Sequence, residues 1–446
     1  MHQYAGIQNA QKLGQYDVEQ SSKIVKRLAY SHYRLMMIGA AQLPARMNWD
    51  FKAGLARSVY EDAQAMKMWV DRASELRNPQ LQKMKSPDPW LELFWDELLM
   101  ARSDYELWVG VYEVAKPAIT RLYEQYLEST QPLVDYPTVR LMKHARLDLE
   151  EQLAWGAAIQ PVLLEDARYF NAHSDQYHVV IDDEASAQPY KDHLLELLHN
   201  CGGMAGEAVE NNRTPIRWRS KEAYRIPDKA VRDPRMGGDT LGRTGVKNQP
   251  DDDVIAGAAE AARIRQEELG AAELCAATLV MQQGMPWEFY DDLSRHCWDE
   301  MRHTLYGQAV LDLGGFEWFS QPQFKGDYDP HMDKPVAASY VWLSVGIEGE
   351  AMKKEQMPKE SRFYTKLAQQ REEPFVKLLA QGIDFDWADE VTHHRYGRKW
   401  AEELVGGYGN ARLIADKEMA LNNERMRVDT RNYWTGKMFS HRYIGS

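Results

Sequence analysis

Apolar residues recur along most of this chain at the spacing of an α-helix, with polar positions between them. This period predicts amphipathic helices rather than strands. The longest stretch with β character is short and runs from Tyr177 to Asp182. We therefore expect an all-α protein. Two clear helical series are Leu141, Ala145, Leu149 and Leu153, and Val376, Leu379 and Ile383.

Four long helices are expected in the first part of the chain, and prolines separate them. Pro44 follows the first helix, and Pro137 opens the fourth at a position where its missing N–H costs little. The expected ranges are about 18–43, 49–77, 89–129 and 137–164.

The composition then shifts toward Gly, Pro, Asp and Arg. From 166 to 251 we expect a long irregular connector that carries one short helix near Lys191 to Asn200. Its arginines suggest either a clamp that joins the flanking helical sets through ion pairs or a lid over an acidic or phosphorylated group. They are Arg217, Arg219, Arg225, Arg232, Arg235 and Arg243.

A second helical set follows the connector and ends in an aromatic, basic tail. It divides the chain into a first helical domain at 1–165, the connector at 166–251 and a second helical domain at 252–446. The expected helices span about 252–284, 286–314, 334–356, 358–406 with a break near Gly382, and 409–427.

The two helical sets resemble each other when the chain is shifted by 238 residues. Five positions within a window of eleven are then identical, including a tryptophan and a phenylalanine. We interpret the sets as copies of one four-helix unit. The matched residues are Met47, Trp49, Phe51, Leu55 and Arg57 in the first copy, and Met285, Trp287, Phe289, Leu293 and Arg295 in the second.

Composition and charge exclude several classes of function. With 54 Lys and Arg against 67 Asp and Glu, the chain has a formal charge of −13, which disfavours nucleic acid and anionic membranes as partners. The three cysteines stand far apart and predict neither a disulfide scaffold nor a cysteine zinc site. No secretory signal or membrane-spanning apolar run is present, so a cytoplasmic protein is expected.

Two E-x-x-H motifs carry the candidate chemistry. Glu300 and His303 are three residues apart, and Glu390 and His393 repeat this spacing ninety residues later. Residues three apart share one face of a helix, so each pair can chelate a metal ion. Two such motifs on separate helices of one set predict a metal site in the helical core.

Such a site needs one further inward carboxylate from each of the two remaining helices. Glu273 lies in a stretch too apolar for a solvent face, AAELCAATLVM, and Glu348 ends the apolar run VWLSVGIE. Glu350 competes with Glu348. We prefer Glu348, because core-directed residues such as Val341 and Val345 share its face.

The order Glu, E-x-x-H, Glu, E-x-x-H resembles the ferritin-like superfamily of di-iron and di-manganese carboxylate proteins. The phrases DEMRHT and DEVTHHRYG are similar to those of a ferritin-like oxidase or oxygenase group, and the resemblance covers roughly residues 252–406. It implies a ferritin-like four-helix bundle, and together with the internal repeat this predicts tandem ferritin-like bundles of which only the second binds metal. It also implies Glu273 and Glu348 as terminal carboxylates, Glu300 and Glu390 as bridging catalytic carboxylates, and His303 and His393 as nitrogen ligands.

Carboxylates mixed with imidazoles suit iron or manganese better than calcium or magnesium. We expect two iron ions, with manganese or a mixed Mn/Fe pair as alternatives, in an oxidoreductase that uses dioxygen to oxidise or hydroxylate a small organic substrate. Such an enzyme needs an electron donor, and a homodimer is compatible with it. Alternatives are peroxide disproportionation, iron oxidation, or a metal-free scaffold that binds a partner protein.

The first copy lacks this constellation. It is expected to be a packing partner without metal ligands, in which Gln152 falls near the place of a histidine. His296 either lines a cavity beside the metals or is merely packed. The positions 238 residues before Glu273, Glu300 and His303 hold Leu35, Asp62 and Ala65. A shifted site in that copy would use Glu61, Asp62, His144 and Glu151.

Overall fold

The computed structural model describes residues 3–78, 84–178, 181–207, 209, 214–246, 251–349 and 356–433, with side chains as far as residue 422. Its described part is mostly helical, which confirms the all-α prediction. The described residues contain two very short strands, β1 (Asp239–Thr240) and β2 (Gln323–Phe324). These pair in parallel, with Asp239 opposite Gln323 and Thr240 opposite Phe324.

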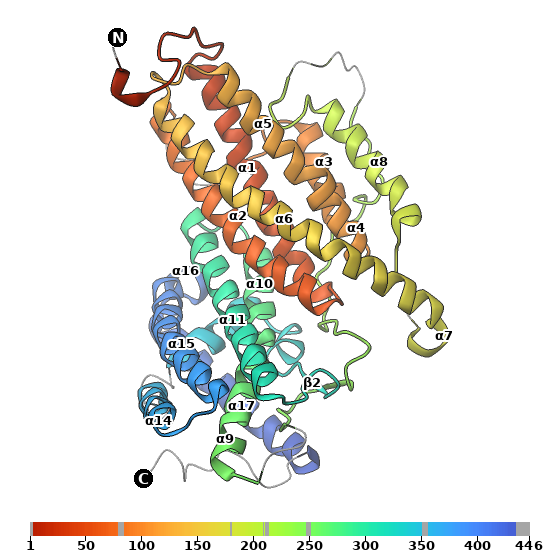
Figure 1. The fold of residues 1–446 in the computed structure, drawn as a ribbon, viewed down its shortest axis with the longest axis vertical. Helices are drawn as coiled ribbons and strands as arrows, with labels where there is room; N and C mark the ends of the chain where they lie inside the picture. The colour runs from red at the N-terminus through yellow and green to blue at the C-terminus, as the bar shows by residue number, and fades with distance from the viewer. Residues whose placement is uncertain are drawn as a thin grey trace. The chain divides into compact units, whose positions relative to one another are not determined.

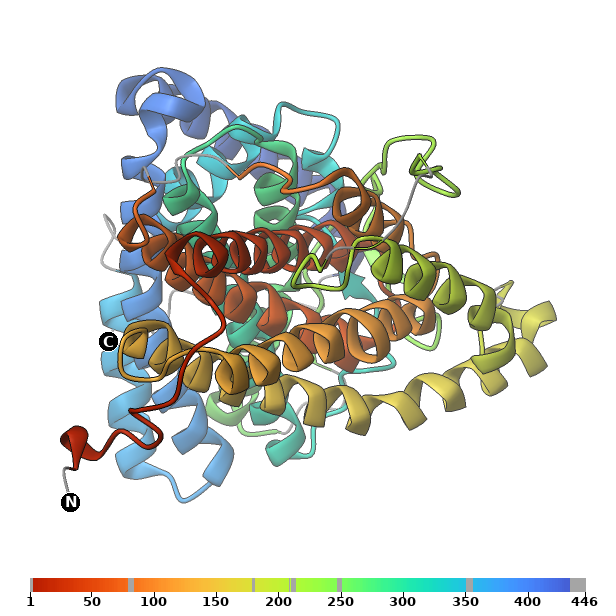
Figure 2. The same ribbon diagram turned by 90° about the horizontal axis from the view of Figure 1, so that it is seen from above.

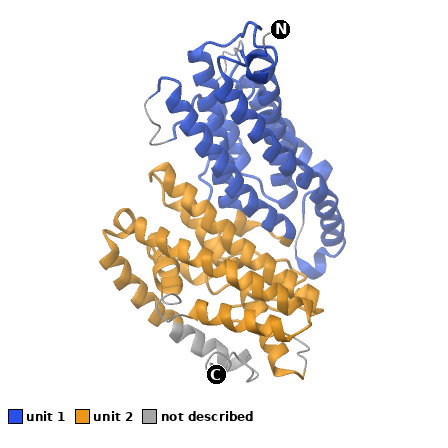
Figure 3. Ribbon diagram, turned by 60° about the vertical axis from the view of Figure 1, so that its left-hand side comes forward, with its two compact units in different colours: residues 1–42, 50–225 blue, residues 43–49, 226–446 orange. Residues whose placement is uncertain are grey.

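The chain forms two compact units, coloured separately in Figure 3. Unit 1 comprises residues 1–42 and 50–225, and unit 2 comprises residues 43–49 and 226–446. The predicted connector is therefore divided, because 166–225 belong to unit 1 and 226–251 to unit 2. It is also more helical than expected, since α8 spans Glu184–Asn200.

Unit 1 is built on long helices whose beginnings match the predicted ones. Asp88 caps the start of the expected helix 89–129 through its side chain, but this helix is interrupted after Leu99, and Ser103 caps a new helix start. The fourth helix runs further than predicted, to Ala172. The elements are α1 (Val18–Gln42), α2 (Trp49–Glu75), α3 (Pro89–Leu99), α4 (Asp104–Trp108), the π-helical η3 (Val109–Ala115), α5 (Lys116–Ser129), α6 (Tyr136–Ala172) and α7 (Ser174–Tyr177).

Helices α2 and α6 of unit 1 run antiparallel. Arg57 near the start of α2 meets Glu151, whereas Arg72 near its end meets Thr138 at the start of α6. Helix α5 also lies beside α6, as the orange and yellow ribbons show in Figure 1 and, from above, in Figure 2. The buried faces between these helices form the core of unit 1.

Unit 2 holds the helices on which the E-x-x-H motifs lie. The predicted range 286–314 agrees closely with α11 (Trp287–Gly314). The expected break near Gly382 is wrong, because α15 runs unbroken and Gly382 instead makes room for the Tyr306 ring. The other elements are α9 (Asp253–Gln266), α10 (Leu269–Met281), α12 (Val336–Val341), the π-helical η5 (Trp342–Ile347), α14 (Gln356–Gln370), α15 (Pro374–Lys399), α16 (Ala401–Val405) and α17 (Tyr408–Tyr433).

Helix α11 is central in unit 2, with α9, α10 and α15 beside it (Figure 1). It runs antiparallel to α15, since Asp292 meets Trp400 while Tyr306 meets Asp386. It is also antiparallel to α10, since the Tyr290 hydroxyl donates to the Gln282 carbonyl while the Cys297 thiol donates to the Ala272 carbonyl. These directions decide which side chains of the three helices come together.

Five of the six arginines of the predicted connector form ion pairs within their own units: Arg217, Arg219, Arg232, Arg235 and Arg243. Arg219 makes two hydrogen bonds to Glu106 in unit 1, and Arg235 pairs with its neighbour Asp233 in unit 2. These ion pairs are thus local clamps. None of the described helices combines the length and apolar character needed to cross a membrane. All three cysteines are buried and free of disulfides.

Candidate metal centre

Ionisable side chains from several helices converge in the core of unit 2. Helix α11 contributes His296, Glu300 and His303, and α15 contributes Asp386, Glu390 and His393, in each case at positions i, i+4 and i+7. This spacing places each trio on one helical face. Because the two helices are antiparallel, His303 lies near Asp386, and His296 lies near His393.

The first group consists of His296, Glu300, Glu348 and His393, whose ligand atoms all lie within 4.8 Å of one another. The Nε2 atom of His296 is 2.9 Å from Oε1 of Glu348 and 3.3 Å from Oε1 of Glu300. The Nδ1 atom of His393 is 3.3 Å from the same Glu300 oxygen. All four residues are buried.

The second group consists of Glu268, His303 and Asp386. The Nδ1 atom of His303 lies 3.3 Å from Oε2 of Glu268 and 3.5 Å from Oδ1 of Asp386. This group is oxygen-rich, because it offers two carboxylates and one imidazole.

Glu300 lies between the two groups. Its Oε1 atom faces His393, and its Oε2 atom is 4.0 Å from Nδ1 of His303. Glu390 belongs to a third group with Glu300 and His303, and its Oε1 atom is 3.9 Å from Nδ1 of His393. Glu300 and Glu390 thus occupy positions from which each can reach both groups.

Glu348 reaches the cluster from a local distortion of its helix. It directly follows the π-helical turn η5, which is buried almost throughout. A π-turn adds a residue to the helical repeat and so rotates the side chains that follow it. Such turns are frequent at functional sites.

The histidines of the two E-x-x-H motifs are each held by an aspartate from the other helix. Nε2 of His303 lies 3.3 Å from Asp389, and Nε2 of His393 lies 3.2 Å from Asp299. Each aspartate directly precedes the glutamate of its motif. A histidine that contacts a carboxylate through one nitrogen and directs the other inward is the usual arrangement of a metal ligand.

Two arginines fix these aspartates in place. Arg302 pairs with both Asp299 and Asp389, and Arg295 pairs with Asp299 at 2.7 Å and with Asp389 at 3.2 Å. Burial raises the pKa of Asp299, but His393 and Arg302 outweigh it and hold that pKa well below its usual range. Both aspartates therefore remain ionised acceptors for the histidines.

The electrostatics of the inner carboxylates favour a bound cation. Burial raises the pKa of Glu390 well above its usual range, and the negative charges of Glu348 and Glu300 raise it further. Burial also raises the pKa of Glu300, but His296 and His393 outweigh burial and hold that pKa below its usual range. A divalent ion at this position would relieve the repulsion between the carboxylates.

Several inward atoms lie within ion-pair distance of one another but have no partner in hydrogen-bond geometry, although hydrogen bonding normally satisfies buried polar atoms. This pattern fits ligands directed at a cation, and the mixture of oxygen and nitrogen donors fits iron or manganese. Among the described residues, these atoms are Nε2 of His296, Nδ1 of His303, Nδ1 of His393, both carboxylate oxygens of Glu348 and Oε2 of Glu268.

Arg265 lies just outside the oxygen-rich group. Its guanidinium contacts Asp386 at 2.5 Å, Glu360 at 3.2 Å and Glu268 at 3.3 Å. It also donates a hydrogen bond to the Tyr306 hydroxyl. Glu268 and Asp386 each direct one oxygen at this cation and the other at His303, so a fixed positive charge partly neutralises the group.

The structure brings together five of the six residues predicted as ligands: Glu300, His303, Glu348, Glu390 and His393. It does not bring Glu273 to them. That carboxylate is fully buried in a two-pronged ion pair with Arg232, with contacts of 2.6 and 2.8 Å. The competitor Glu350 lies outside the described residues.

Glu268, five residues before Glu273, is the carboxylate of this part of the chain that faces His303. It lies between α9 and α10, at a break that the expected helix 252–284 did not contain. Sequence reasoning also missed Asp386, and it left the role of His296 open. The available signal was the spacing, because each of these two residues stands one turn before a motif glutamate.

Unit 1 has a buried polar cluster of another kind. His32 Nδ1 lies 2.9 Å from Asp62, and the ammonium of Lys116 lies 3.3 Å from the other oxygen of Asp62 and bonds to Gln152. A lysine therefore supplies the positive charge in this cluster. In the described part of unit 1 no group suited to a metal was found, and the shifted site around Glu61 and His144 is not assembled.

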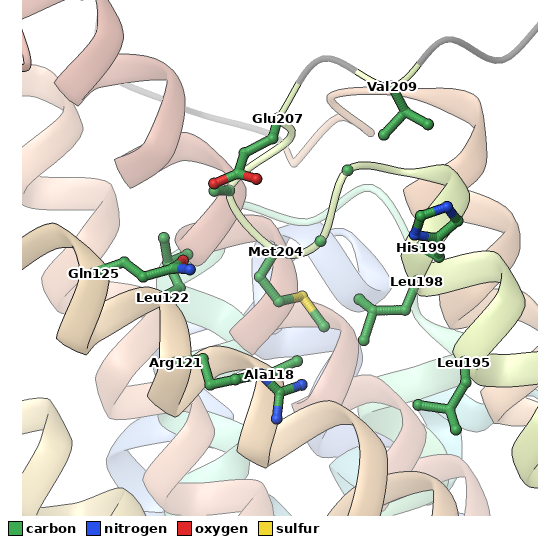
Figure 4. Close-up of a pocket in the computed structure, with 13 residues that line it drawn as sticks. Ala118, Arg121, Leu122, Gln125, Leu195, Leu198, His199, Met204, Glu207 and Val209 are labelled. Atoms are coloured by element: carbon green, nitrogen blue, oxygen red, sulfur yellow. The ribbon is translucent and has the colours of Figure 1, made fainter.

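A pocket of about 600 Å³ lies elsewhere in unit 1, between α5 and the end of α8. In Figure 4, Met204 lies between Gln125 and Glu207 on one side and His199 and Leu198 on the other. Its lining mixes apolar and polar groups without the convergent charges of the unit 2 cluster. We assign it no chemistry.

Comparisons with known proteins add no assignment to this geometry. No family model matches the chain, and no similar curated protein or solved structure was found.

Proposed function

We propose that unit 2 is an oxidoreductase with a dinuclear metal centre, most simply di-iron, that uses dioxygen to oxidise or hydroxylate a small organic substrate. The observation that carries the proposal is the convergence of buried nitrogen and oxygen atoms without hydrogen-bond partners in two groups that share Glu300. This arrangement supports two neighbouring metal positions rather than one.

The proposed ligands differ from the expected set by one replacement and two additions. Glu268 takes the role expected of Glu273, and His296 and Asp386 each add a donor one turn before the shared glutamates. The metal pair would supply electrons and open coordination positions for dioxygen. The full proposed set is Glu268, His296, Glu300, His303, Glu348, Asp386, Glu390 and His393.

The charges of this set are consistent with two divalent ions. The five carboxylates contribute −5 and two divalent ions +4, and Arg265 contributes a further +1 that it shares with Glu360. A metal-free scaffold would have to offset this charge with protonated histidines such as His303. Burial lowers the pKa of His303, but Asp386, Asp389 and Glu268 raise it well above its usual range. Buried ion pairs of this kind are costly. This balance favours the metal centre over the scaffold alternative.

Around the metals, other residues of the chain would orient the ligands and exchange protons with them. Asp299 and Asp389 keep the inward nitrogens of His393 and His303 directed at the centre. Tyr306, hydrogen-bonded to Asp386 and Arg265, lies where a proton could pass to or from Asp386. Repeated turnover would require an external electron donor.

The proposal includes the internal duplication, with unit 1 as the copy without metal. In unit 1, Arg57 pairs with Glu61 at 2.6 Å and with Glu151 at 3.0 Å. The residues 238 positions later are Arg295, Asp299 and Asp389. They pair in the same way, at 2.7 and 3.2 Å. One shift thus relates both the sequence repeat and an ion-pair network, which supports common descent.

The π-helical turns give a second parallel between the copies. Lys116 directly follows the π-turn η3, as Glu348 directly follows η5, and both side chains are buried and directed at their unit's polar cluster. By its place after the π-turn, Lys116 in unit 1 thus resembles Glu348 in unit 2, although the two residues are 232 positions apart and the shift of 238 does not superpose them. An ammonium group in place of a carboxylate accounts for a copy that needs no metal.

The first test is the metal content per chain, by elemental mass spectrometry, of protein made in cells supplied with iron and manganese. We expect about two metal ions, the number a paired carboxylate site holds. Glu300→Ala and His393→Ala should lose metal. His394→Ala is the matched control, because His394 adjoins His393 but bonds to the Ser344 carbonyl instead.

A second measurement addresses the reaction. Protein reduced without oxygen and then mixed with dioxygen should consume it, and the His393→Ala variant should not. Full metal retention in Glu300→Ala and His393→Ala would contradict the proposed ligand set, because the metal would then be bound elsewhere. No metal after reconstitution with ferrous iron would contradict the dinuclear centre and favour the metal-free scaffold.

A further inference from the structure

Helices α11 and α15 meet along a seam, and three basic side chains form ion pairs across it. Arg295 and Arg302 reach from α11 to Asp389, at 3.2 and 2.8 Å. Lys399 reaches in the other direction, from α15 to Asp292, at 2.6 Å. Because Asp389 is one of the aspartates that hold the motif histidines, the two arginines lie behind it as seen from the candidate metal centre.

The basic ends of these ion pairs face solvent, and the acidic ends do not. The side chains of Arg295, Arg302 and Lys399 are 39, 35 and 50% exposed. The side chains of their carboxylate partners are only 11 to 15% exposed across the seam. The chain carries a formal charge of −13, yet it presents cations to solvent along this seam.

An exposed aromatic ring accompanies the cations. Phe385 lies one turn before Asp389 on α15, so the two residues share one face of the helix. It is 71% exposed, although burying a phenylalanine is normally favourable. Aromatic and arginine side chains together are typical of protein–protein interfaces. We define the seam surface as Arg295, Arg302, Phe385 and Lys399.

Only two side chains separate the seam surface from each proposed metal ion. Arg302 contacts Asp389, which lies 3.3 Å from Nε2 of the ligand His303. The second motif histidine is connected to the surface in the same way, through the other aspartate and the other arginine. Since electron transfer slows steeply with distance, these short connections make the seam surface a favourable place for electrons to enter.

We propose that the seam surface docks a small acidic electron-transfer protein, which supplies the electrons that the metal centre needs. This inference rests on the proposed function, because only a redox centre needs such a donor. Exposed cations steer a partner of opposite charge and select its orientation, and redox encounters of this kind use small interfaces. Each docking event delivers one electron, so two reduced carriers become oxidised for each ferric pair that becomes ferrous.

The test uses the full-length protein, with an acidic plant-type [2Fe–2S] ferredoxin as the probe, because it is a one-electron carrier of low potential. Calorimetric titration with the oxidised ferredoxin measures the Kd without any reaction. We expect binding that weakens as salt is added, because ions screen exposed charges. Rapid mixing of the iron-loaded protein with reduced ferredoxin then measures the rate of metal reduction.

Two variants of the seam surface test its role, and each has a matched control in unit 2. Phe385→Ala should raise the Kd by about tenfold, as at a central interface residue. Lys399→Glu should lower the association rate by about tenfold at low salt. Leu413→Ala is the control for the ring, because Leu413 on α17 is equally exposed. Lys377→Glu is the control for the charge, because Lys377 also lies on α15, is 48% exposed and pairs with one carboxylate.

Neither control should change the binding of ferredoxin. All four variants should keep the wild-type metal content, since none replaces a proposed ligand. Dithionite, a small reductant that needs no docking surface, should reduce all of them at the wild-type rate. Circular dichroism checks that the variants keep their helices.

The outcomes separate this inference from the proposed function. Wild-type binding in both Phe385→Ala and Lys399→Glu, or no binding of ferredoxin to the wild type, would overturn the docking surface and leave the dinuclear centre intact. A dimer that Phe385→Ala converts to monomers in the ultracentrifuge would also overturn it, because a second copy would then cover this face. A chain that binds no metal but docks ferredoxin through Phe385 and Lys399 would support the surface and contradict the proposed function.

Discussion

The Nε2 atom of His393 lies 3.2 Å from a carboxylate oxygen of Asp299, on the neighbouring antiparallel helix. This contact directs Nδ1 of His393 toward Glu300 and Glu348. The mirror contact joins His303 to Asp389. Each D-E-x-x-H helix therefore supplies the aspartate that orients the other helix's histidine.

Removing this support should weaken metal binding without removing a ligand. Asp299→Asn is expected to lower the affinity for metal by about 10-fold to 100-fold, because the neutral amide no longer holds the imidazole as strongly. Competition with a chelator of known affinity measures the change. Asp416→Asn, at an exposed aspartate on α17, is the control. Equal affinities in Asp299→Asn and wild type would rule out the orienting role.

The position of the first carboxylate gives the second prediction. Glu268→Gln should lower the metal content, because Glu268 faces His303. Glu273→Gln should keep its metal but lower the free energy of unfolding by about 3 kcal/mol, the cost of leaving a buried partner such as Arg232 without its countercharge. Elemental analysis and urea unfolding of both variants separate the two effects. The reverse pattern would restore Glu273 as the ligand.

The ligand predicted from the sequence, Glu273, lies five residues after Glu268, the carboxylate that faces His303. This difference shows what local sequence patterns can and cannot predict. The E-x-x-H pairs were predictable, because three-residue spacing on one helix fixes which side chains share a face. Choosing between Glu268 and Glu273 depends on where α9 ends and on how α10 is aligned against α11. Those are contacts between distant parts of the chain, and a strongly apolar environment also suits a carboxylate paired with an arginine.

The same limit explains the other departures in the fold. The starts of α2 and α11 were predictable from Pro44, Pro286 and the tryptophans that follow them. The π-turns before Lys116 and Glu348 leave no comparable signal, because they change helical geometry without a proline or glycine at a fixed place. In the sequence, a glycine such as Gly382 suggests a break in the helix. In the structure, it makes room for the Tyr306 ring from another helix.

Lys116 of unit 1 gives a third prediction. Its side chain is fully buried against Asp62. Lys116→Met should lower the free energy of unfolding by about 3 to 5 kcal/mol, because it leaves a buried carboxylate short of positive charge. Metal content should remain that of the wild type, since the proposed ligands all lie in unit 2. Urea unfolding and elemental analysis test both parts.

The double variant Lys116→Met with Asp62→Asn is the control for this cluster. Replacing both charges should recover much of the lost stability, since residues in direct contact do not act additively. A double variant as unstable as the sum of the two single variants would mean that the lysine stabilises unit 1 through packing alone.

The pH dependence of unfolding provides the fourth prediction. Burial raises the pKa of Asp62, but Lys116 and His32 outweigh it, so the folded-state pKa is lower than normal. A lowered pKa means that the ionised carboxylate stabilises the fold at any pH above its unfolded value of about 3.9. That contribution is lost as the pH falls through the folded-state pKa. The wild type should therefore be more stable than Asp62→Asn at pH 7, and the difference should shrink below about pH 4.

Urea unfolding of both proteins between pH 7 and pH 3 measures this difference. Both must be free of metal, so that protonation of the unit 2 cluster affects them equally. Because a protonated Asp62 and the amide of the Asp62→Asn variant are both neutral, the stabilities of the two proteins should converge in acid. A difference that stays constant across this range would show that Asp62 acts through its shape and hydrogen bonds, with no contribution from its charge.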